Sequence, residues 1–487
     1  MSGLEYDSRR VKQGDLFVAM RGESSDGNQF IDKAIGAGAV AIVTDSAAEK
    51  PRASVAWAQV AHGRRALARL SANFYKRPAE CLAITGITGT NGKSTVAFLV
   101  ESILAAADRK SALVGTIEYH VAGKVLPAPH TTPEALDLNR ILSDARGHGA
   151  TEAVMEVSSH ALAQERVYGI PFDVAVFTNL TRDHLDYHHT MEEYFAAKQM
   201  LFEGCGTDAP RASVINIEDD YGQRLVQVSQ EHSAAVLTYG LDKGDFHAEK
   251  TEITSRGTRF DLITPDGAIP IFSALIGRVN VFNVIAAAAA GYARGCKQGA
   301  IIKGIETLRR VPGRFERVDC NQPFTVVVDY AHTDAALRNL TALAREFVRQ
   351  AGHGSRVITI FGCGGDRDRA KRPLMGEAAG RGSDFVVLTS DNPRSEDPLA
   401  IINDAMVGLQ RAGAKYTVEP DRRAAITMAV AEAGPGDIVL IAGKGHEKVQ
   451  VTREGSRPFD DVEVARQALH AAGYSCEAAN AAAGKHA

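Results

Sequence analysis

The chain has 487 residues, a length that suggests about three domains. A hydrophobic content of 45% and a charged content of 23% are ordinary for a soluble globular protein. The formal net charge is −4 and no long basic run occurs, which argues against a general nucleic-acid binder. No stretch approaches the roughly 18 uninterrupted apolar residues of a membrane span.

The cysteines and the N-terminal residues indicate in which cellular compartment the protein works. Six cysteines are scattered without C-x-x-C spacing, which favours reduced thiols over a disulfide framework or a structural zinc site. Residues 1–15 contain no apolar core of a secretory signal. We therefore expect a cytoplasmic protein without a membrane span.

The first 80 residues predict a small α/β domain. Residues 15–19 and 39–43 have the apolar composition of strands, and residues 30–38 read as a helix. The basic, proline-containing segment 75–78 marks a boundary. We expect the first domain to span residues 1–80.

A strand, a glycine-rich loop and a helix follow this boundary, in the stretch CLAITGITGTNGKS (81–94). The apolar run 82–84 enters the loop, and an apolar-periodic helix is expected over 95–107. Backbone N–H groups and the positive end of the helix then face one point, and glycine lets a phosphate approach the backbone. The pattern predicts a nucleotide-phosphate site.

Two side chains support this prediction. Lys93 would place a positive charge on the β- and γ-phosphates, and Ser94 would offer a hydroxyl ligand to Mg²⁺. The spacing departs from strict G-x-x-x-x-G-K-[ST], because Ile87 stands where the first glycine belongs and Gly86 lies one residue early. The alternative is an ordinary strand-to-helix turn that happens to contain Gly-Lys-Ser.

The α/β alternation continues along the rest of the chain and predicts two further domains, 81–312 and 313–487. A β-rich stretch is expected over 236–270, a hinge over 311–313, and frayed or disordered residues over 476–487. Strands alternating with helices indicate mostly parallel sheets. The apolar strands are expected at 153–157, 174–177, 213–217, 325–329, 356–361, 385–389 and 437–442.

Candidate metal ligands lie at strand ends after the phosphate loop. Glu156 ends an apolar strand, where a charge is costly unless it has a partner; the alternative is an edge-strand glutamate in solvent. The next strand runs into the Asp- and His-rich segment 178–188, which contains His184. Alone it could be a zinc site or a solvated loop, but beside a phosphate loop it favours magnesium and phosphate contacts.

Lys198 lies within an apolar stripe. The predicted helix 191–202 carries Met191, Tyr194, Phe195 and Phe202 at helical spacing, and Lys198 falls inside that stripe. One reading is a lysine that snorkels from the rim of the stripe. The other is a desolvated, neutral amine that is open to carbamate formation with CO₂.

Three charged turns follow strands of the last domain, at 361–368, 391–394 and 443–447. Loops at the carboxyl ends of parallel strands converge on one crevice. Arginine suits a bidentate grip on a carboxylate, and an acidic side chain suits an ammonium group. The crevice is therefore predicted to hold an amino acid.

The motifs of the chain resemble, in their order, those of the Mur ligases. The resemblance covers nearly the whole chain and implies a UDP-sugar domain, a central P-loop ATPase and a C-terminal Rossmann-like domain that binds the incoming amino acid. It rests on TGTNGKS (88–94), HTTPE (130–134), MEVSSHAL (155–162), NLTRDHLDYH (179–188), VPGRFE (311–316), VDYAH (328–332), GCGGDRD (362–368), DNPR (391–394) and GKGHE (443–447).

The resemblance also implies a reaction and its site residues. The reaction is ATP-dependent, ADP-forming addition of diaminopimelate to UDP-N-acetylmuramoyl-L-alanyl-D-glutamate, in peptidoglycan precursor synthesis, by a cytoplasmic monomer. Implied catalytic residues are Lys93, Glu156, His184 and Lys198. Mg²⁺ would be held by Ser94, Glu156 and carbamylated Lys198. Implied ATP contacts are Gly89, Thr90, Asn91, Gly92, Lys93, Ser94, Asn283, Arg314, Asp329 and His332.

Two substrate sites follow from the same resemblance. Contacts to the nucleotide dipeptide are implied for Ser8, Thr131, Thr132, Ser158, Gln164 and Arg166. Contacts to diaminopimelate are implied for Arg367, Asp391, Asn392, Pro393, Arg394, Gly443 and Glu447. The DNPR arginine marks diaminopimelate-adding members, because Arg394 would grip the second carboxylate that lysine lacks.

Other functions share parts of this pattern. A folylpolyglutamate synthetase shares the ATPase plan, but DNPR and the first domain weigh against it. A nucleotide-dependent regulatory module would use the phosphate loop as a switch, and the predicted amino-acid crevice weighs against that.

Overall fold

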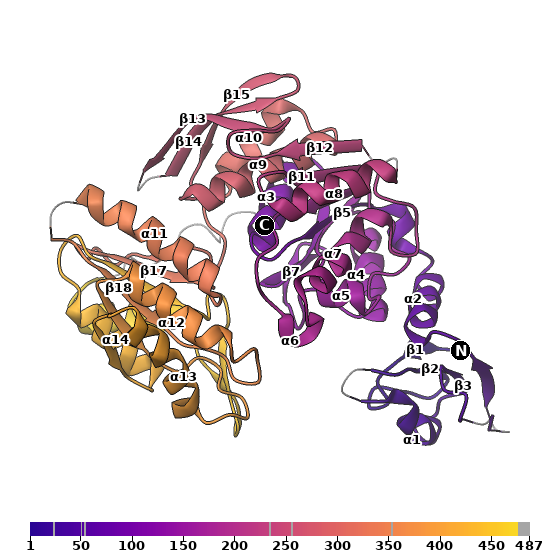
Figure 1. Cartoon of the computed structure of the whole chain (residues 1–487). Helices are drawn as coiled ribbons and strands as arrows, with labels where there is room; N and C mark the ends of the chain where they lie inside the picture. The colour runs from indigo at the N-terminus through magenta and orange to yellow at the C-terminus, as the bar shows by residue number, and fades with distance from the viewer. Residues whose placement is uncertain are drawn as a thin grey trace.

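The computed structural model has three regions, with the central one between the other two (Figure 1). It describes residues 1–22, 25–49, 51–52, 55–232, 235–254, 257–351 and 354–475. Each region has its own sheet and helices. The predicted α/β class with mostly parallel sheets is confirmed. The segment 476–487, for which fraying was predicted, lies outside the described residues.

The N-terminal region is a parallel sheet between two helices. Its strands follow one another as β1 (Gly3–Glu5), β2 (Asp15–Ala19), β3 (Ala41–Thr44) and β4 (Ala56–Gln59). Along β2, Leu16 and Val18 pack toward Leu67 of α2 (Gly63–Phe74), while Phe17 packs toward α1 (Ile31–Gly36). The predicted helix 30–38 is shorter because Gly38 leaves it with a φ of +109°.

The central region contains an eight-stranded sheet in the order β12-β11-β10-β5-β9-β6-β7-β8. Its parallel strands are β5 (Ala83–Thr88), β6 (Ser111–Val114), β9 (Glu152–Glu156), β10 (Val174–Phe177), β11 (Ala212–Asn216) and β12 (Ala235–Tyr239). The antiparallel edge is made by β7 (Glu118–Val121) and β8 (Lys124–Pro127). Because Ile87 pairs with Glu156 and Thr88 with Phe177, the ends of three strands meet beside the phosphate loop.

Helices cover both faces of this sheet and bury two apolar cores. One core contains α3 (Lys93–Ala106), α9 (Arg278–Ala293) and α10 (Gln298–Thr307), and the other contains α4 (Ala135–Gly147) and α7 (Met191–Glu203). Shorter helices are α5 (Ser159–Ala163) and α6 (Leu185–His188), and α8 (Asp220–Glu231) lies at the side of β11. The β-rich stretch predicted after β12 is a separate antiparallel sheet of β13 (His247–Thr254), β14 (Gly257–Thr264) and β15 (Gly267–Ser273).

The C-terminal region is a six-stranded sheet in the order β16-β17-β21-β18-β19-β20. The strands are β16 (Glu316–Val318), β17 (Thr325–Asp329), β18 (Val357–Phe361), β19 (Phe385–Leu388), β20 (Tyr416–Val418) and β21 (Ile438–Ala442). The helices are α11 (Asp334–Ala351), α12 (Lys371–Gly382), α13 (Pro398–Arg411), α14 (Arg422–Glu432) and α15 (Asp461–Ala471). A hairpin of β22 (Val449–Thr452) and β23 (Gly455–Pro458) lies beyond β21.

The expectation of reduced thiols is confirmed for four of the five described cysteines and fails for one. Cys81, Cys205, Cys296 and Cys363 are free, but Cys320 takes part in a disulfide. Within the described part of the chain, no helix is both long and apolar enough to cross a membrane.

Candidate active site

The phosphate loop is shaped by two glycines that no larger residue could replace. Gly89 has a φ of +142° and Gly92 a φ of +90°. A Cβ on Gly89 would lie 1.9 Å from Thr178 Oγ1, and one on Gly92 would lie 2.5 Å from Asn283 Oδ1. Glycine is therefore required by both backbone conformation and space. Helix α3 begins at Lys93, directly after the loop.

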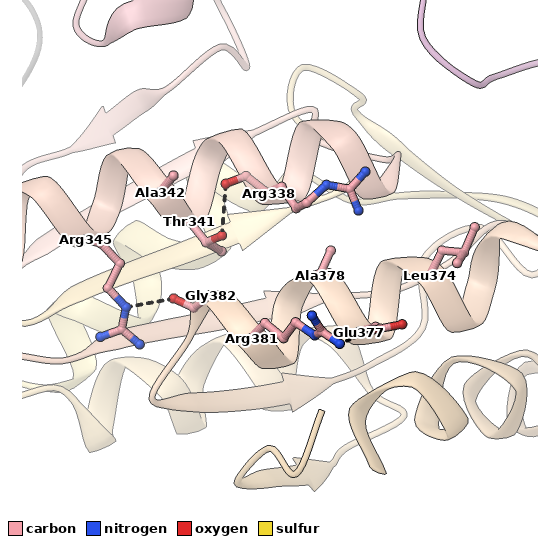
Figure 2. Close-up of a pocket in the computed structure, with 9 residues that line it drawn as sticks. All are labelled: Arg338, Thr341, Ala342, Arg345, Leu374, Glu377, Ala378, Arg381 and Gly382. Carbon is pink, nitrogen blue, oxygen red and sulfur yellow. Dashed lines mark hydrogen bonds and ion pairs between the residues drawn. The ribbon is translucent and has the colours of Figure 1, made fainter. Parts of the chain in front are cut away.

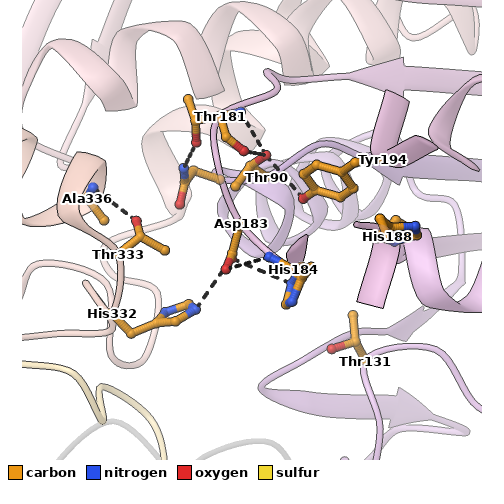
Figure 3. A network of polar contacts seen from close by, with 12 residues as sticks. Thr90, Thr131, Thr181, Asp183, His184, His188, Tyr194, His332, Thr333 and Ala336 are labelled. Carbon is orange, nitrogen blue, oxygen red and sulfur yellow. Dashed lines mark hydrogen bonds and ion pairs between the residues drawn. The ribbon is translucent and has the colours of Figure 1, made fainter. Parts of the chain in front are cut away.

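The loop after β10 fixes the phosphate loop from the side. Thr90 N donates to Asn179 O over 2.8 Å, and Asn91 N donates to Asn179 Oδ1 over 3.0 Å. Thr90 Oγ1 lies 3.2 Å from both Thr181 O and the Tyr194 hydroxyl (Figure 3). The segment 179–181, singled out by its sequence, thus holds the phosphate loop in shape before any ligand binds.

Two lysine amines share one carbonyl of this loop. Lys93 Nζ donates to Gly89 O over 3.0 Å, and Lys198 Nζ donates to the same oxygen over 2.9 Å. Lys198 is 1% exposed and its Nζ lies 4.6 Å from the centre of the Tyr194 ring. Burial, followed by the charge of Lys93, lowers the pKa of Lys198 well below its usual value. The structure therefore favours the reading of Lys198 as a desolvated amine over that of a snorkelling surface lysine.

Glu156 is a buried carboxylate without a basic partner. It ends β9, is 1% exposed, and accepts hydrogen bonds from Thr116 N at 2.8 Å and Thr116 Oγ1 at 2.9 Å. No ion pair is formed by Glu156 within the described residues. A buried carboxylate of this kind fits a cation, because carboxylate and hydroxyl oxygens are hard ligands of the type that Mg²⁺ takes. No group of three His, Cys, Asp or Glu side chains suited to a metal occurs in the part of the chain that was searched.

Asp183 connects the central and C-terminal regions (Figure 3). Its carboxylate lies 3.5 Å from His184 Nε2, 3.8 Å from His332 Nε2 and 3.9 Å from Lys371 Nζ. Burial opposes ionisation of Asp183, but these three neighbours hold its pKa at about 2. Burial also lowers the pKa of His184, to about 3, so its ring is neutral at pH 7.

A cavity of about 450 Å³ adjoins the phosphate loop and includes predicted ATP contacts. Asn91, Gly92, Asn283, Arg314 and Asp329 line it. Arg314 Nη2 donates to Ser94 Oγ over 3.2 Å, and its buried Nε has no hydrogen-bond partner in the described chain. An orphaned guanidinium donor fits a phosphate or another acceptor. His332 contacts Asp183 and does not line this cavity.

Most residues predicted to contact the dipeptide form one hydrogen-bonded group beside Glu156. Thr131 Oγ1 lies 3.0 Å from Thr116 Oγ1, and Thr132 Oγ1 donates to Glu156 O over 2.8 Å. Ser158 N donates to Thr132 Oγ1 over 3.1 Å. Arg166 donates to Gln164 Oε1 over 2.7 Å and to Thr132 O over 3.1 Å.

Two residues of this area were missed by the sequence reasoning, and one predicted residue lies elsewhere. Arg64 of α2 and Arg166 both pair with Glu134, at 3.2 Å and 3.0 Å. Glu134 ends the motif HTTPE, whereas Arg64 has no motif that could reveal it. Ser8 is buried in the N-terminal region, and within the described residues no side-chain hydrogen bond joins it to the group around Glu156.

The three predicted turns of the C-terminal region do meet. Arg394 Nη1 donates to Gly365 O over 2.8 Å, and Asn392 Nδ2 donates to Glu447 Oε2 over 2.7 Å. A Cβ on Gly443 would lie 2.5 Å from Asp391 Oδ2. Pro393 and Arg367 belong to the same turns, with Arg367 Nη1 bonded to Asp366 O. Lys444, which the sequence reasoning did not assign, contacts both Asn392 and Glu447.

A second cavity of about 340 Å³ lies between α11 and α12 (Figure 2). Three arginines line it, and each is already engaged: Arg338 with Asp334, Arg345 with Gly382 O and Asp384, and Arg381 with Glu377. None of the predicted site residues lines this cavity.

Comparison with known proteins identifies the family. The description "Mur ligase middle domain" matches residues 87–291, "Mur ligase, glutamate ligase domain" matches 313–445, and "Mur ligase family, catalytic domain" matches 1–75. A protein of Solibacter usitatus is 54% identical over 97% of this chain and 94% of its own length. The chain belongs to the Mur ligase family.

The Solibacter relative is named UDP-N-acetylmuramoyl-L-alanyl-D-glutamate–2,6-diaminopimelate ligase. A Geobacter metallireducens protein with the same name is 46% identical over 95% of this chain and 93% of its own length. Among solved structures, a ligase of that name aligns with a TM-score of 0.68 and 34% identity, covering 97% of this Mur ligase and 95% of that chain.

A Mycobacterium tuberculosis folylpolyglutamate synthase shares the fold more distantly. It aligns with a TM-score of 0.62 and 21% identity and covers 77% of this Mur ligase and 91% of that chain.

Proposed function

We propose that this Mur ligase joins the D-glutamate γ-carboxylate of UDP-N-acetylmuramoyl-L-alanyl-D-glutamate to an amine of meso-diaminopimelate, with conversion of ATP to ADP and phosphate. The observation that carries the proposal is that the three strand-end turns meet and bring together Asp391, Asn392, Arg394 and Glu447. Relatives that are 46–54% identical carry the name of this activity.

The regions have separate roles in this proposal. Residues 1–80 bind the UDP end of the nucleotide sugar through Ser8, residues 81–312 bind ATP, and residues 313–487 bind diaminopimelate. The dipeptide lies along the group around Glu156, formed by Thr131, Thr132, Ser158, Gln164 and Arg166. The salt bridge from Arg64 of α2 to Glu134, which also pairs with Arg166, supports a substrate path that runs from the N-terminal region to this group.

The first chemical step activates the acid. A γ-carboxylate oxygen of the substrate attacks the γ-phosphorus of ATP, the bond from that phosphorus to the bridging oxygen breaks, and ADP leaves with the bonding pair. Such a transfer needs mainly positioning and charge neutralisation. The loop 89–92 and the charges of Lys93 and Arg314 supply both, and Asn283 and Asp329 line the nucleotide cavity. His332, outside that cavity, would act from its contact with Asp183.

The second step forms the amide bond. The neutral amine of diaminopimelate attacks the acyl-phosphate carbonyl, a tetrahedral intermediate forms, and the carbon–oxygen bond to phosphate breaks. The ammonium proton leaves to solvent or to phosphate. Hydrogen-bond donors and cations that face the developing charge lower the barrier. His184, neutral at pH 7 next to Asp183, is placed to donate or accept a hydrogen bond there.

The residues present fit Mg²⁺ and a modified lysine. Glu156 forms no ion pair within the described part of the chain, Ser94 lies in the first turn of the phosphate-loop helix, and Lys198 is a buried amine near the charge of Lys93. We propose that Lys198 reacts with CO₂ to become a carbamate and holds Mg²⁺ together with Ser94 and Glu156. When bound, the ion would neutralise phosphate charge.

A coupled assay of ADP release tests the function. Purified full-length chain should release ADP only when ATP, the nucleotide dipeptide and diaminopimelate are all present. Replacing diaminopimelate with lysine should reduce turnover sharply, because the guanidinium of Arg394 would then lack its carboxylate. Equal turnover with lysine would contradict the assignment of the amino-acid substrate.

A further inference from the structure

Lys444 is completely buried beneath the proposed amino-acid crevice. It follows β21, its side chain is 0% exposed, and its Nζ donates to Asn392 Oδ1 and Glu447 Oε2, each over 3.0 Å. An ammonium group has three donors and is costly to bury unless it is paired. Because it is buried, Lys444 contacts its protein neighbours and does not reach solvent.

The contacts of Lys444 determine how Asn392 is oriented. Asn392 Oδ1 accepts from Lys444 Nζ and also from Val451 N, over 2.9 Å. Both partners are donors only, so this atom must be the amide oxygen. Asn392 Nδ2 therefore points the other way and donates to Glu447 Oε2 over 2.7 Å.

The three side chains form a closed triangle that leaves one carboxylate oxygen free. Glu447 Oε2 accepts from both Lys444 and Asn392. Glu447 Oε1 accepts no hydrogen bond from the described residues, and the Glu447 side chain is 28% exposed. The two hydrogen bonds to Oε2 thus fix the direction of the other oxygen, among the turns that also carry Arg394.

We propose that Lys444 is a positioning residue that aims Glu447 Oε1 at an ammonium group of the incoming diamino acid. This inference rests on the proposed function of the same crevice. Without the buried ammonium, Glu447 would keep only the Asn392 bond and would rotate among several rotamers. The pocket would then bind the amino acid less tightly, while the nucleotide cavity, which Lys444 does not line, would be unaffected.

Steady-state kinetics and calorimetry on the full-length chain test the proposal. Lys444→Met should raise KM for diaminopimelate and weaken its calorimetric Kd by about tenfold to a hundredfold, as expected for the loss of a hydrogen bond to a charged group. KM for ATP should stay within about twofold of wild type, because a local change in the crevice leaves the nucleotide cavity intact. Lys444→Gln keeps a hydrogen-bond donor, so it should weaken the diaminopimelate Kd less than Lys444→Met does. It also provides a second test if the Met variant folds poorly.

Lys448→Met is the matched control. Lys448 belongs to the same segment but is 62% exposed and pairs with Asp460, so its loss should leave both KM values unchanged. An unchanged diaminopimelate Kd in both Lys444 variants would overturn the inference and leave the proposed function standing. A parallel rise of both KM values would also overturn it, by showing general damage. Failure of the wild-type chain to bind diaminopimelate would overturn the proposed function itself.

Discussion

At the level of single residues, Lys198 is the most unusual side chain of the site. It is a lysine in the apolar face of α7, with one backbone carbonyl as its hydrogen-bond partner and another lysine nearby. A free ammonium gains little there, because both burial and the neighbouring charge oppose it. Conversion to a carbamate would reverse the sign of its charge and turn this unfavourable position into a cation site.

Lys198→Ala should reduce kcat by at least about 10²-fold, because the carbamate that would hold Mg²⁺ against the charge of the transferred phosphoryl group is lost. Short-chain carboxylic acids should restore part of the activity by replacing the carbamate. With ¹³C-bicarbonate, wild-type protein should show a carbamate signal by NMR that the variant lacks. Lys303→Ala, at an exposed position of α10, should behave like wild type. Wild-type activity of Lys198→Ala would refute the carbamate.

Arg394→Ala should change the choice of amino acid. Loss of the guanidinium should lower kcat/KM for diaminopimelate by about tenfold to a hundredfold, the usual effect of a lost hydrogen bond to a charged group. The value for lysine should change less, so the ratio of the two substrates narrows. Arg411→Ala, at the exposed end of α13, is the control. An unaltered ratio would mean that another residue reads the second carboxylate.

The sequence motifs pointed to side chains that the structure brings together, and they missed contacts that only the fold makes. The resemblance to Mur ligases pointed to Asn392, Arg394 and Glu447, and the structure brings them together. Lys444 lies inside the quoted motif GKGHE, but its contacts depend on a residue 52 positions away. No local pattern reports such a contact, and for the same reason Arg64 escaped notice.

At the level of elements, the turn from β5 into α3 depends most strictly on its sequence. Gly89→Ala would force a side chain onto a φ of +142° and to within 1.9 Å of Thr178 Oγ1. Strain of about 1–3 kcal/mol is expected from the backbone alone. The variant should therefore melt at a lower temperature and lose ATP binding, measured by thermal shift with and without nucleotide.

The variant Gly123→Ala separates the backbone strain of a positive φ from the steric overlap of the new Cβ. Gly123, between β7 and β8, also has a positive φ, +74°, but a Cβ there would meet nothing within 4 Å. This control should show a small decrease in melting temperature and normal ATP binding. Equal behaviour of the two variants would mean that the contact with Thr178 is unimportant.

The sequence predicted where strands and helices occur better than it predicted the residues at which they begin. Strands β10 and β17 match the predicted ranges 174–177 and 325–329, because continuous β-branched and apolar residues suit only a buried strand. The predicted strand 39–43 begins at Ala41 instead, since Gly38 is held in a turn with a φ of +109°. Helix α3 starts two residues before the predicted 95, because Gly92 caps it in a left-handed conformation.

At the scale of the whole molecule, ion pairs join the central and C-terminal regions. Asp183 faces His332 and Lys371, and Arg182 lies 3.6 Å from Asp368. The apolar clusters of the C-terminal region contain no residue of the central sheet. The two regions can therefore separate without exposing apolar core, in keeping with a site that must open to admit its substrates.

The charge of Asp183 should make this junction sensitive to acid. Its pKa in the folded chain, about 2, is below the unfolded value near 3.8, so its contribution is complete above the unfolded pKa and is lost as the pH falls toward 2. Asp183→Asn should lower the melting temperature at pH 6, and its difference from wild type should shrink by pH 3. Scanning calorimetry between pH 6 and pH 3 measures this difference in melting temperature. Asp186→Asn, at an exposed position of α6, should show no such trend.

The connection between the central and C-terminal regions, where a hinge is predicted at 311–313, is held on both sides of Pro312. Val311 is fully buried in the central core, whereas Gly313 O accepts a hydrogen bond from Tyr330 N over 2.9 Å and Gly313 packs against His446. Only Pro312 lies between these two anchors, and its ring fixes φ. The C-terminal region that carries the proposed amino-acid site is thus joined to the central region through very few rotatable bonds. A short, stiff connection keeps the attacking amine at high effective concentration near the acyl phosphate, so the intermediate meets its amine before it meets water.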